Sequence, residues 1–273
     1  MQVLRSCVVA IASALLWGCA GSFEVIDPTS PPALAYNEGT QKLRQGKPEQ
    51  AVKLLRYALV QRPIFPEAQI NLAVALAALG QTVEAESLYR DVIRLRPQMA
   101  LAHVNLGAIL LSRKDYQEAL THLQEGLDLD PRLPQGHGSL ARLYFARREL
   151  AKAKEQASLA ILIAPNDAQY YALLGSMYLS NNNLDEALPE LKTAVLLDPN
   201  NPQYRKLVGQ ALLKKGKWEG AAVEFQIALR LNPQSAETYV LLAEAAKKKQ
   251  SYDEGLEFLR QALRVEPKIG RAS

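Results

Sequence analysis

Proline recurs in this chain at an interval of 34 residues without interruption. The seven positions are Pro63, Pro97, Pro131, Pro165, Pro199, Pro233 and Pro267. A constant interval over most of a chain predicts one structural unit repeated in tandem, since every unit must end at the same place. We therefore expect the 273-residue chain to fold as a stack of seven similar units and to bury its core between neighbouring units.

The unit that begins at Pro66 predicts two helices joined by a short turn. Leu72, Leu76 and Leu79 recur at helical spacing before Gly80, and further apolar residues recur after it, up to Pro97. The eighth position is small in every unit: Gly39, Ala73, Gly107, Ala141, Gly175, Gly209 and Ala243. The twentieth position is alanine or glycine throughout. Because helices cross closely only where side chains are small, these positions predict an antiparallel helix pair.

Small residues at positions eight and twenty, with proline at position thirty-two, resemble the tetratricopeptide repeat (TPR) pattern. The resemblance covers Pro32 to Ile269. It implies an all-α fold, a right-handed α-solenoid of seven helix-turn-helix repeats whose first helices line a concave groove for proteins or peptides. The expected repeats are 32–65, 66–99, 100–133, 134–167, 168–201, 202–235 and 236–269, followed by a tail at 270–273.

The start of the chain has the features of a secretory signal. Arg5 is the only charged residue up to Trp17, and the uncharged stretch that follows it is too short to span a bilayer. Leu16-Trp17-Gly18-Cys19 resembles the bacterial lipobox, with Trp17 in place of the usual small residue. The resemblance implies a signal peptide at 1–18 and lipidation of Cys19, whose acyl chains hold the protein in a membrane. The alternative is a secreted protein cleaved after Ala20 or Gly21.

The lipobox resemblance also implies a location. It implies that residues 19–31 form a lipidated N-terminus and a short tether. Neither Ala20 nor Gly21 is the aspartate that retains lipoproteins at the inner membrane in enterobacteria. We therefore expect a lipid-anchored protein of the bacterial cell envelope, at the outer membrane and facing the periplasm.

Composition and motifs argue against an enzyme and against nucleic-acid binding. The formal net charge is only +4, and no basic run with interleaved aromatic residues is present. His103 and His137 share the fourth repeat position, where Tyr171 and Tyr239 stand in other repeats, so we expect them to pack in the core. No pattern of a nucleophile with its base or of metal ligands emerges. We expect no catalysis, no cofactor and no metal.

The expected groove has two parts. The sixth position should face the concave side, and Asn37, Asn71 and Asn105 occupy it in the first three repeats, resembling the asparagine ladder of the O-GlcNAc transferase superhelix. An amide both donates and accepts, so a ladder could bind a peptide backbone; the alternative is that asparagine is merely common at this position. The other predicted groove residues are Ile70, Val74, Val104, Ala108 and Leu111, with basic Arg142 and Lys206 further along.

The last repeat lacks the polar helix that usually covers the end of such an array. Leu256, Phe258, Leu259 and Leu263 lie on its second helix with no repeat after them. Uncovered apolar surfaces of this kind often mediate contacts, so we expect self-association or docking of a partner helix here.

The sequence thus indicates a non-catalytic, membrane-anchored scaffold or adaptor that binds envelope proteins or extended peptides in its groove. Two more specific roles remain open. One is biogenesis of type IV pili through secretin assembly, and the other is regulation of a separately encoded enzyme such as a peptidoglycan hydrolase.

Overall fold

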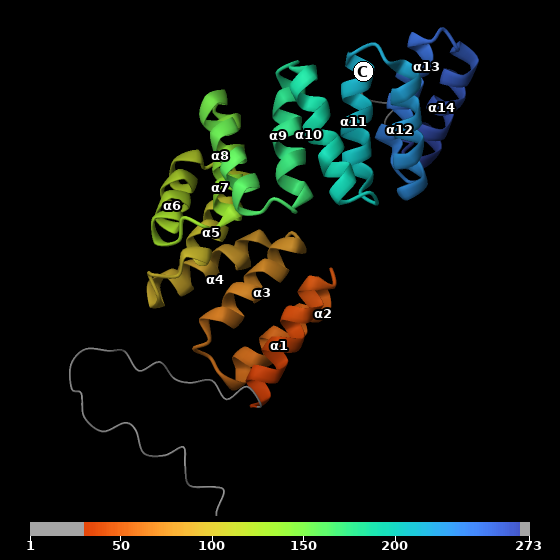
Figure 1. The fold of residues 1–273 in the computed structure, drawn as a ribbon. Coiled ribbons are helices and arrows are strands. Elements are labelled where there is room, and N and C mark those ends of the chain that lie inside the picture. The colour runs from red at the N-terminus through yellow and green to blue at the C-terminus, as the bar shows by residue number, and fades with distance from the viewer. Residues whose placement is uncertain (1–29, 268–273) are drawn as a thin grey trace, which may run out of the picture.

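The computed structural model describes residues 30–267, which form a row of fourteen α-helices. The first helices of the repeats are α1 (Pro31–Arg44), α3 (Pro66–Ala78), α5 (Ala100–Ser112), α7 (Pro134–Ala146), α9 (Ala168–Ser180), α11 (Pro202–Lys214) and α13 (Ala236–Lys248). The second helices are α2 (Pro48–Gln61), α4 (Thr82–Leu95), α6 (Tyr116–Leu129), α8 (Leu150–Ile163), α10 (Leu184–Leu197), α12 (Trp218–Leu231) and α14 (Tyr252–Val265). The helix pairs stack in a curved row with α1 and α14 at opposite ends (Figure 1). The prediction of an all-α solenoid of seven helix pairs is confirmed.

The turn inside each repeat depends on one residue in the left-handed backbone region. This fifteenth position has φ between 61° and 77° in all seven repeats: Gly46, Gly80, Lys114, Arg148, Asn182, Gly216 and Gln250. In repeat one the amide of Lys47 donates to Lys42 O and that of Gly46 to Leu43 O, so the last carbonyls of α1 are satisfied. Glycine adopts this conformation without steric cost, whereas the other four residues reach it at a cost of about 1 kcal/mol or more each.

The small eighth position is required because the twenty-fourth side chain packs directly against it. A Cβ atom added to Gly209 would lie 2.5 Å from the ring of Phe225, and one added to Gly107 would lie 2.6 Å from Leu123. The backbone oxygen of Ala119, at position twenty, is also close to Gly107. Positions eight, twenty and twenty-four therefore form one contact that holds the two helices of a repeat together.

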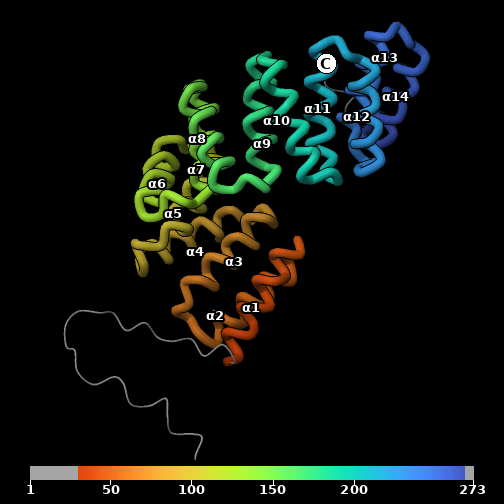
Figure 2. Tube along the Cα trace, viewed as in Figure 1, coloured from red at the N-terminus to blue at the C-terminus, as the bar shows by residue number. Residues whose placement is uncertain are grey.

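The curvature follows from which helices touch between repeats. The backbones of successive first helices approach closely along the whole described array, whereas those of successive second helices stay further apart within residues 30–267 and are linked by side-chain ion pairs such as Arg56–Glu84 and Arg90–Glu118. The first helices are therefore crowded on the inner side and the second helices are spread on the outer side. The trace in Figure 2 follows this path from α1 to α14.

Candidate functional site

The concave side contains a pocket of about 530 Å³ in repeats five to seven. It lies across the three first helices α9, α11 and α13. Leu207 and Leu241 occupy the sixth repeat position and Ser176, Gln210 and Glu244 the ninth, while Leu179, Leu213, Ser180, Lys214 and Lys248 complete the lining from the helix ends. We call this set the concave pocket. Its surface combines apolar leucines with polar and charged groups.

The repeat positions that line the concave pocket include several that the sequence placed in the groove. Val74, Ala108 and Arg142 stand at the ninth position and Leu111 at the twelfth, and all four are at least partly exposed. The sixth position also behaves as expected, since Leu207 and Leu241 line the pocket. These residues share the register of the concave pocket, although the pocket itself lies further along the array than the sequence suggested.

Three predicted groove residues are wrong because the fifth position packs between repeats. Ile70 and Val104 are 2% and 1% exposed and belong to the apolar core. Lys206 is also buried, where its ammonium group pairs with Glu237 at the start of α13. Lys206 thus reaches the first helix of the following repeat, and a buried charge requires such a partner.

Two of the three predicted ladder asparagines bond within the protein. The Asn71 amide donates to Thr40 Oγ1 at 2.8 Å, which links α3 to α1. The side chain of Asn105 hydrogen-bonds with the hydroxyl of Tyr89, whose pKa is raised by burial. Asn37 is exposed. The amides of Asn71 and Asn105 therefore stabilise contacts between repeats, and the ladder remains a prediction.

The positive charge of the concave pocket comes from two lysines at the C-terminal ends of its helices. Lys214 and Lys248 stand at the thirteenth position of α11 and α13, and Lys214 Nζ donates to the carbonyl of Leu179 at 3.3 Å. Because that carbonyl lies in the last turn of α9, the ammonium group offsets the negative end of the helix dipole. The pocket can thus hold apolar side chains on its leucines and polar backbone groups at Gln210 and the lysines.

Most of these pocket residues were not predicted, although their repeat positions were. Leu207 and Leu241 stand at the sixth position, which was predicted to face the concave side on the basis of the asparagines in repeats one to three. Gln210 and Glu244 share the ninth position with Val74 and Ala108. Transferring the predicted positions from repeats two and three to repeats six and seven would have identified them.

The outer face of the last repeat is apolar and exposed, as expected, except at one residue. Leu256, Leu259 and Leu263 are exposed, and with Tyr252 and Val240 they border a second pocket or extend its apolar surface. The prediction that Phe258 belongs to this exposed surface is wrong. Phe258 is partly buried and packs against the cluster that contains Phe225 and Leu242, so it belongs to the core of the last two repeats.

The comparisons with known proteins identify the family of this repeated fold. A sequence model of the cilia and flagella-associated protein 70 C-terminal domain, a TPR domain, matches residues 32–272. The chain belongs to this TPR family. A search of curated protein sequences gave no match.

Solved structures of TPR proteins share the fold at low sequence identity. The APC/C hetero-tetramer Cut9–Hcn1 has a TM-score of 0.73 and 22% identity over 78% of this chain, and the match spans only 42% of the other chain. YrrB, described as a TPR protein with an unusual peptide-binding site, has a TM-score of 0.53 and 21% identity over 66% of this chain and 92% of its own. MamA has a TM-score of 0.55 and 18% identity over 65% and 97% of the respective chains.

Two predictions about the ends of this TPR chain concern residues outside the described range. Cys19 with its lipobox, and the tail at 270–273, lie outside residues 30–267. Among the described helices, none has the length and apolar character needed to cross a membrane.

Proposed function

We propose that this TPR protein is a non-catalytic scaffold that binds an extended segment of another protein in the concave pocket of repeats five to seven. The observation that carries the proposal is the pocket itself. Leucines at the sixth and twelfth repeat positions line it, and a glutamine amide and two lysines lie beside them. An apolar surface with a few placed polar groups is typical of a ligand-binding site.

The size of the concave pocket suggests the length of the bound segment. Packed helices lie about 8–10 Å apart, so the path from α9 across α11 to α13 is roughly 20 Å long. An extended peptide rises about 3.3 Å per residue, so about six residues would cross the pocket. Apolar side chains of that segment would lie on Leu207 and Leu241, and its backbone would face Gln210. The description of YrrB as a peptide-binding TPR protein supports this class of ligand.

The pocket proposal can be tested by site-specific photo-crosslinking in envelope preparations. A photoreactive residue in place of Gln210, in the concave pocket, should give a discrete crosslinked partner. The same residue in place of Gln226, exposed on α12, is the matched control and should not. Adding Leu241→Glu should abolish the crosslink at position 210, because a carboxylate would replace an apolar contact. Equal crosslinking at both positions, or no effect of Leu241→Glu, would rule out the pocket.

We further propose that the scaffold is anchored by lipid at Cys19 and works in the bacterial envelope, at the periplasmic side of the outer membrane. The lipobox sequence supports this location. Two cellular roles fit such a scaffold: assembly of a type IV pilus secretin, and regulation of a separately encoded peptidoglycan hydrolase. Mass spectrometry of the partner crosslinked at position 210 distinguishes them.

The exposed end of repeat seven supports a second contact surface, and we propose that it mediates self-association. Leu256 is 53% exposed and lies beside Tyr252 and Val240 along an apolar pocket of about 530 Å³. Light scattering of the purified chain should show a species larger than a monomer, and Leu256→Glu should convert it to a monomer. Val223→Glu on α12 is the control, since Val223 is equally exposed but lies away from this pocket. A monomer in every case would refute self-association, and unchanged assembly in Leu256→Glu would place the interface elsewhere.

A further inference from the structure

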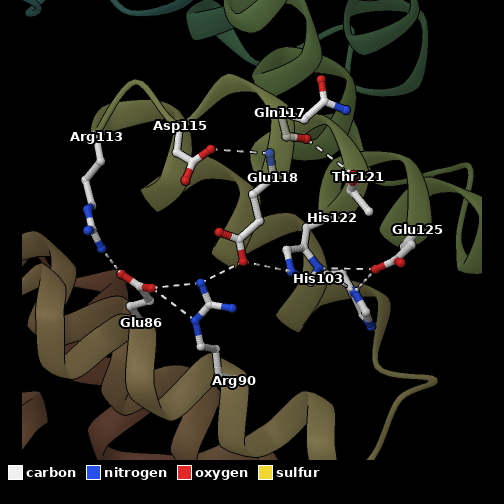
Figure 3. Close-up of polar contacts among 10 residues, drawn as sticks. All are labelled: Glu86, Arg90, His103, Arg113, Asp115, Gln117, Glu118, Thr121, His122 and Glu125. Carbon is white, nitrogen blue, oxygen red and sulfur yellow. Dashed lines mark hydrogen bonds and ion pairs between the residues drawn. The ribbon is translucent and has the colours of Figure 1, made fainter.

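Two histidines and a glutamate converge in repeat three, on α5 and α6. The Nδ1 atoms of His103 and His122 lie 3.2 Å apart. Glu125 Oε2 lies 3.0 Å from the first of them and 3.1 Å from the second. The three atoms thus form a nearly equilateral triangle, and Figure 3 shows the three side chains turned toward one another.

The hydrogen bonding of His103 fixes which of its nitrogens carries the proton. Its Nε2 lies 3.0 Å from the carbonyl oxygen of Pro97, which can only accept a hydrogen bond. Nε2 therefore donates, and in the neutral ring Nδ1 presents a lone pair to His122 and Glu125. His103 is only 6% exposed, so bulk water does not surround this nitrogen.

His122 is arranged in the same way. Its Nε2 lies 3.8 Å from Glu118 Oε1, and the negative carboxylate favours the proton on that nitrogen. With the proton on Nε2, the Nδ1 lone pair of His122 faces His103 Nδ1 and Glu125 Oε2. Three acceptors at about 3 Å repel one another unless a proton or a metal ion lies between them.

We propose that His103, His122 and Glu125 form a binding site for a divalent transition metal of the zinc class. Zinc takes imidazole nitrogen and carboxylate oxygen at about 2.0–2.2 Å. An ion placed about 1 Å outside the plane of the triangle would meet all three atoms at roughly that distance. Two imidazoles with one carboxylate favour zinc and related metals over magnesium or calcium, which prefer oxygen ligands.

The surroundings of the cluster match those of metal ligands. The Pro97 carbonyl and the Glu118 carboxylate face the distal nitrogens of the two histidines, which is the usual arrangement around metal-bound imidazole. Arg90 of α4 holds Glu118 in turn at 2.7 Å, and also bonds Glu86, which pairs with Arg113 (Figure 3). An open pocket borders the cluster and leaves room for water as a further ligand. A bound metal would therefore fix α5 to α6 and, through this network, to α4.

Repeat four has a histidine equivalent to His103, but it lacks the second histidine and the glutamate. His137 stands at the fourth position like His103, and its Nε2 lies 3.0 Å from the Pro131 carbonyl. Its Nδ1 meets Gln156 Oε1 at 2.8 Å, where repeat three has His122. Position twenty-six is Leu159 in repeat four and Glu125 in repeat three. Glutamine at position twenty-three is therefore compatible with the fold but supplies no imidazole, which makes His122→Gln a conservative test.

The experiment is titration of the full chain, purified in detergent and without a histidine tag, with Co²⁺ alone and then with Zn²⁺. Cys7→Ser and Cys19→Ser form the background, because thiolates also bind these metals. We expect one Co²⁺ per chain with the visible absorption of nitrogen and oxygen ligands, and displacement by Zn²⁺. His122→Gln should lower the affinity by more than about 100-fold, beyond the effect of losing an outer partner. The control His137→Gln should leave the affinity unchanged.

Circular dichroism should show equal helicity for the parent and His122→Gln. If that variant unfolds, Glu125→Gln, at a more exposed ligand on α6, tests the same site and should also lose the metal. Zn²⁺ should raise the thermal midpoint of the parent but of neither ligand variant. If the parent takes up no more metal than His122→Gln or Glu125→Gln, the cluster is a histidine pair that shares a proton, and the proposal is wrong.

Discussion

Replacing Leu191 with alanine should lower the free energy of unfolding by about 2–5 kcal/mol, whereas the same replacement at Leu259 should cost only about 1 kcal/mol. Both leucines occupy the twenty-fourth position of their repeats. Leu191 is completely buried and packs against Gly175, in a core cluster with residues of the following repeat such as Val208. Leu259 is 41% exposed because, within residues 30–267, no helix covers the outer face of α14. The difference between the two losses in unfolding free energy measures how much a following repeat stabilises the leucine at this position.

Repeat arrays can unfold in parts, so a single denaturation midpoint does not suffice for this comparison. Hydrogen exchange of amides in α9 to α11 should speed up strongly in Leu191→Ala, while α1 to α4 change little. In Leu259→Ala the faster exchange should be confined to α13 and α14. Equal destabilisation by the two variants would show that repeat seven is covered in solution by something outside the described residues.

Replacing Cys19 with serine should abolish lipid attachment altogether. A serine hydroxyl does not replace the thiol in the thioether link that the lipobox resemblance implies, so labelling with a palmitate analogue should disappear. The protein should also leave the membrane fraction, since each buried CH₂ contributes about 0.8 kcal/mol and stable anchoring needs more than one chain.

Cys7→Ser is the matched control, because Cys7 lies inside the apolar part of the expected signal. That variant should be labelled and sediment like the parent. Retained labelling in Cys19→Ser would contradict the lipoprotein assignment. Cleavage after Ala20 or Gly21 in the unaltered protein, with no label, would instead support the alternative of a secreted protein.

The helical framework was predictable because each of its determinants lies within one repeat. The 34-residue interval, the turn at Gly80 and the small residue at Gly209 specify where helices begin, end and cross. The orientation of the sixth and ninth positions also followed, since one helix face can be read from its own sequence. This is why Val74 and Ala108 share the register of the concave pocket, as the sequence predicted.

Features that depend on the stacking of repeats were not predictable in this way. Ile70 was predicted to line the groove because it is apolar and next to Asn71, but it is buried in the apolar core shared by neighbouring repeats. The twenty-third position is Gln156, Glu190 and Glu224 in repeats four to six, so Phe258 in repeat seven was expected to be exposed, yet it packs against the core cluster that contains Phe225. The pairing of His103 with His122 required the register between α5 and α6, which brings residues 19 apart together, as in Arg205 with Glu224.

The two edges of the solenoid differ in mechanical resistance. The backbones of successive first helices already approach closely along the inner edge, whereas those of successive second helices are further apart along the outer edge of the described array, where exposed ion pairs such as Arg56–Glu84 link them. Tightening the curve compresses packed side chains, and protein interiors have low compressibility. Opening the curve instead separates the first helices, and the wider spacing of the second-helix backbones leaves room for them to approach one another. We therefore expect the solenoid to open more readily than it tightens, so that the concave side can accommodate a bulky ligand.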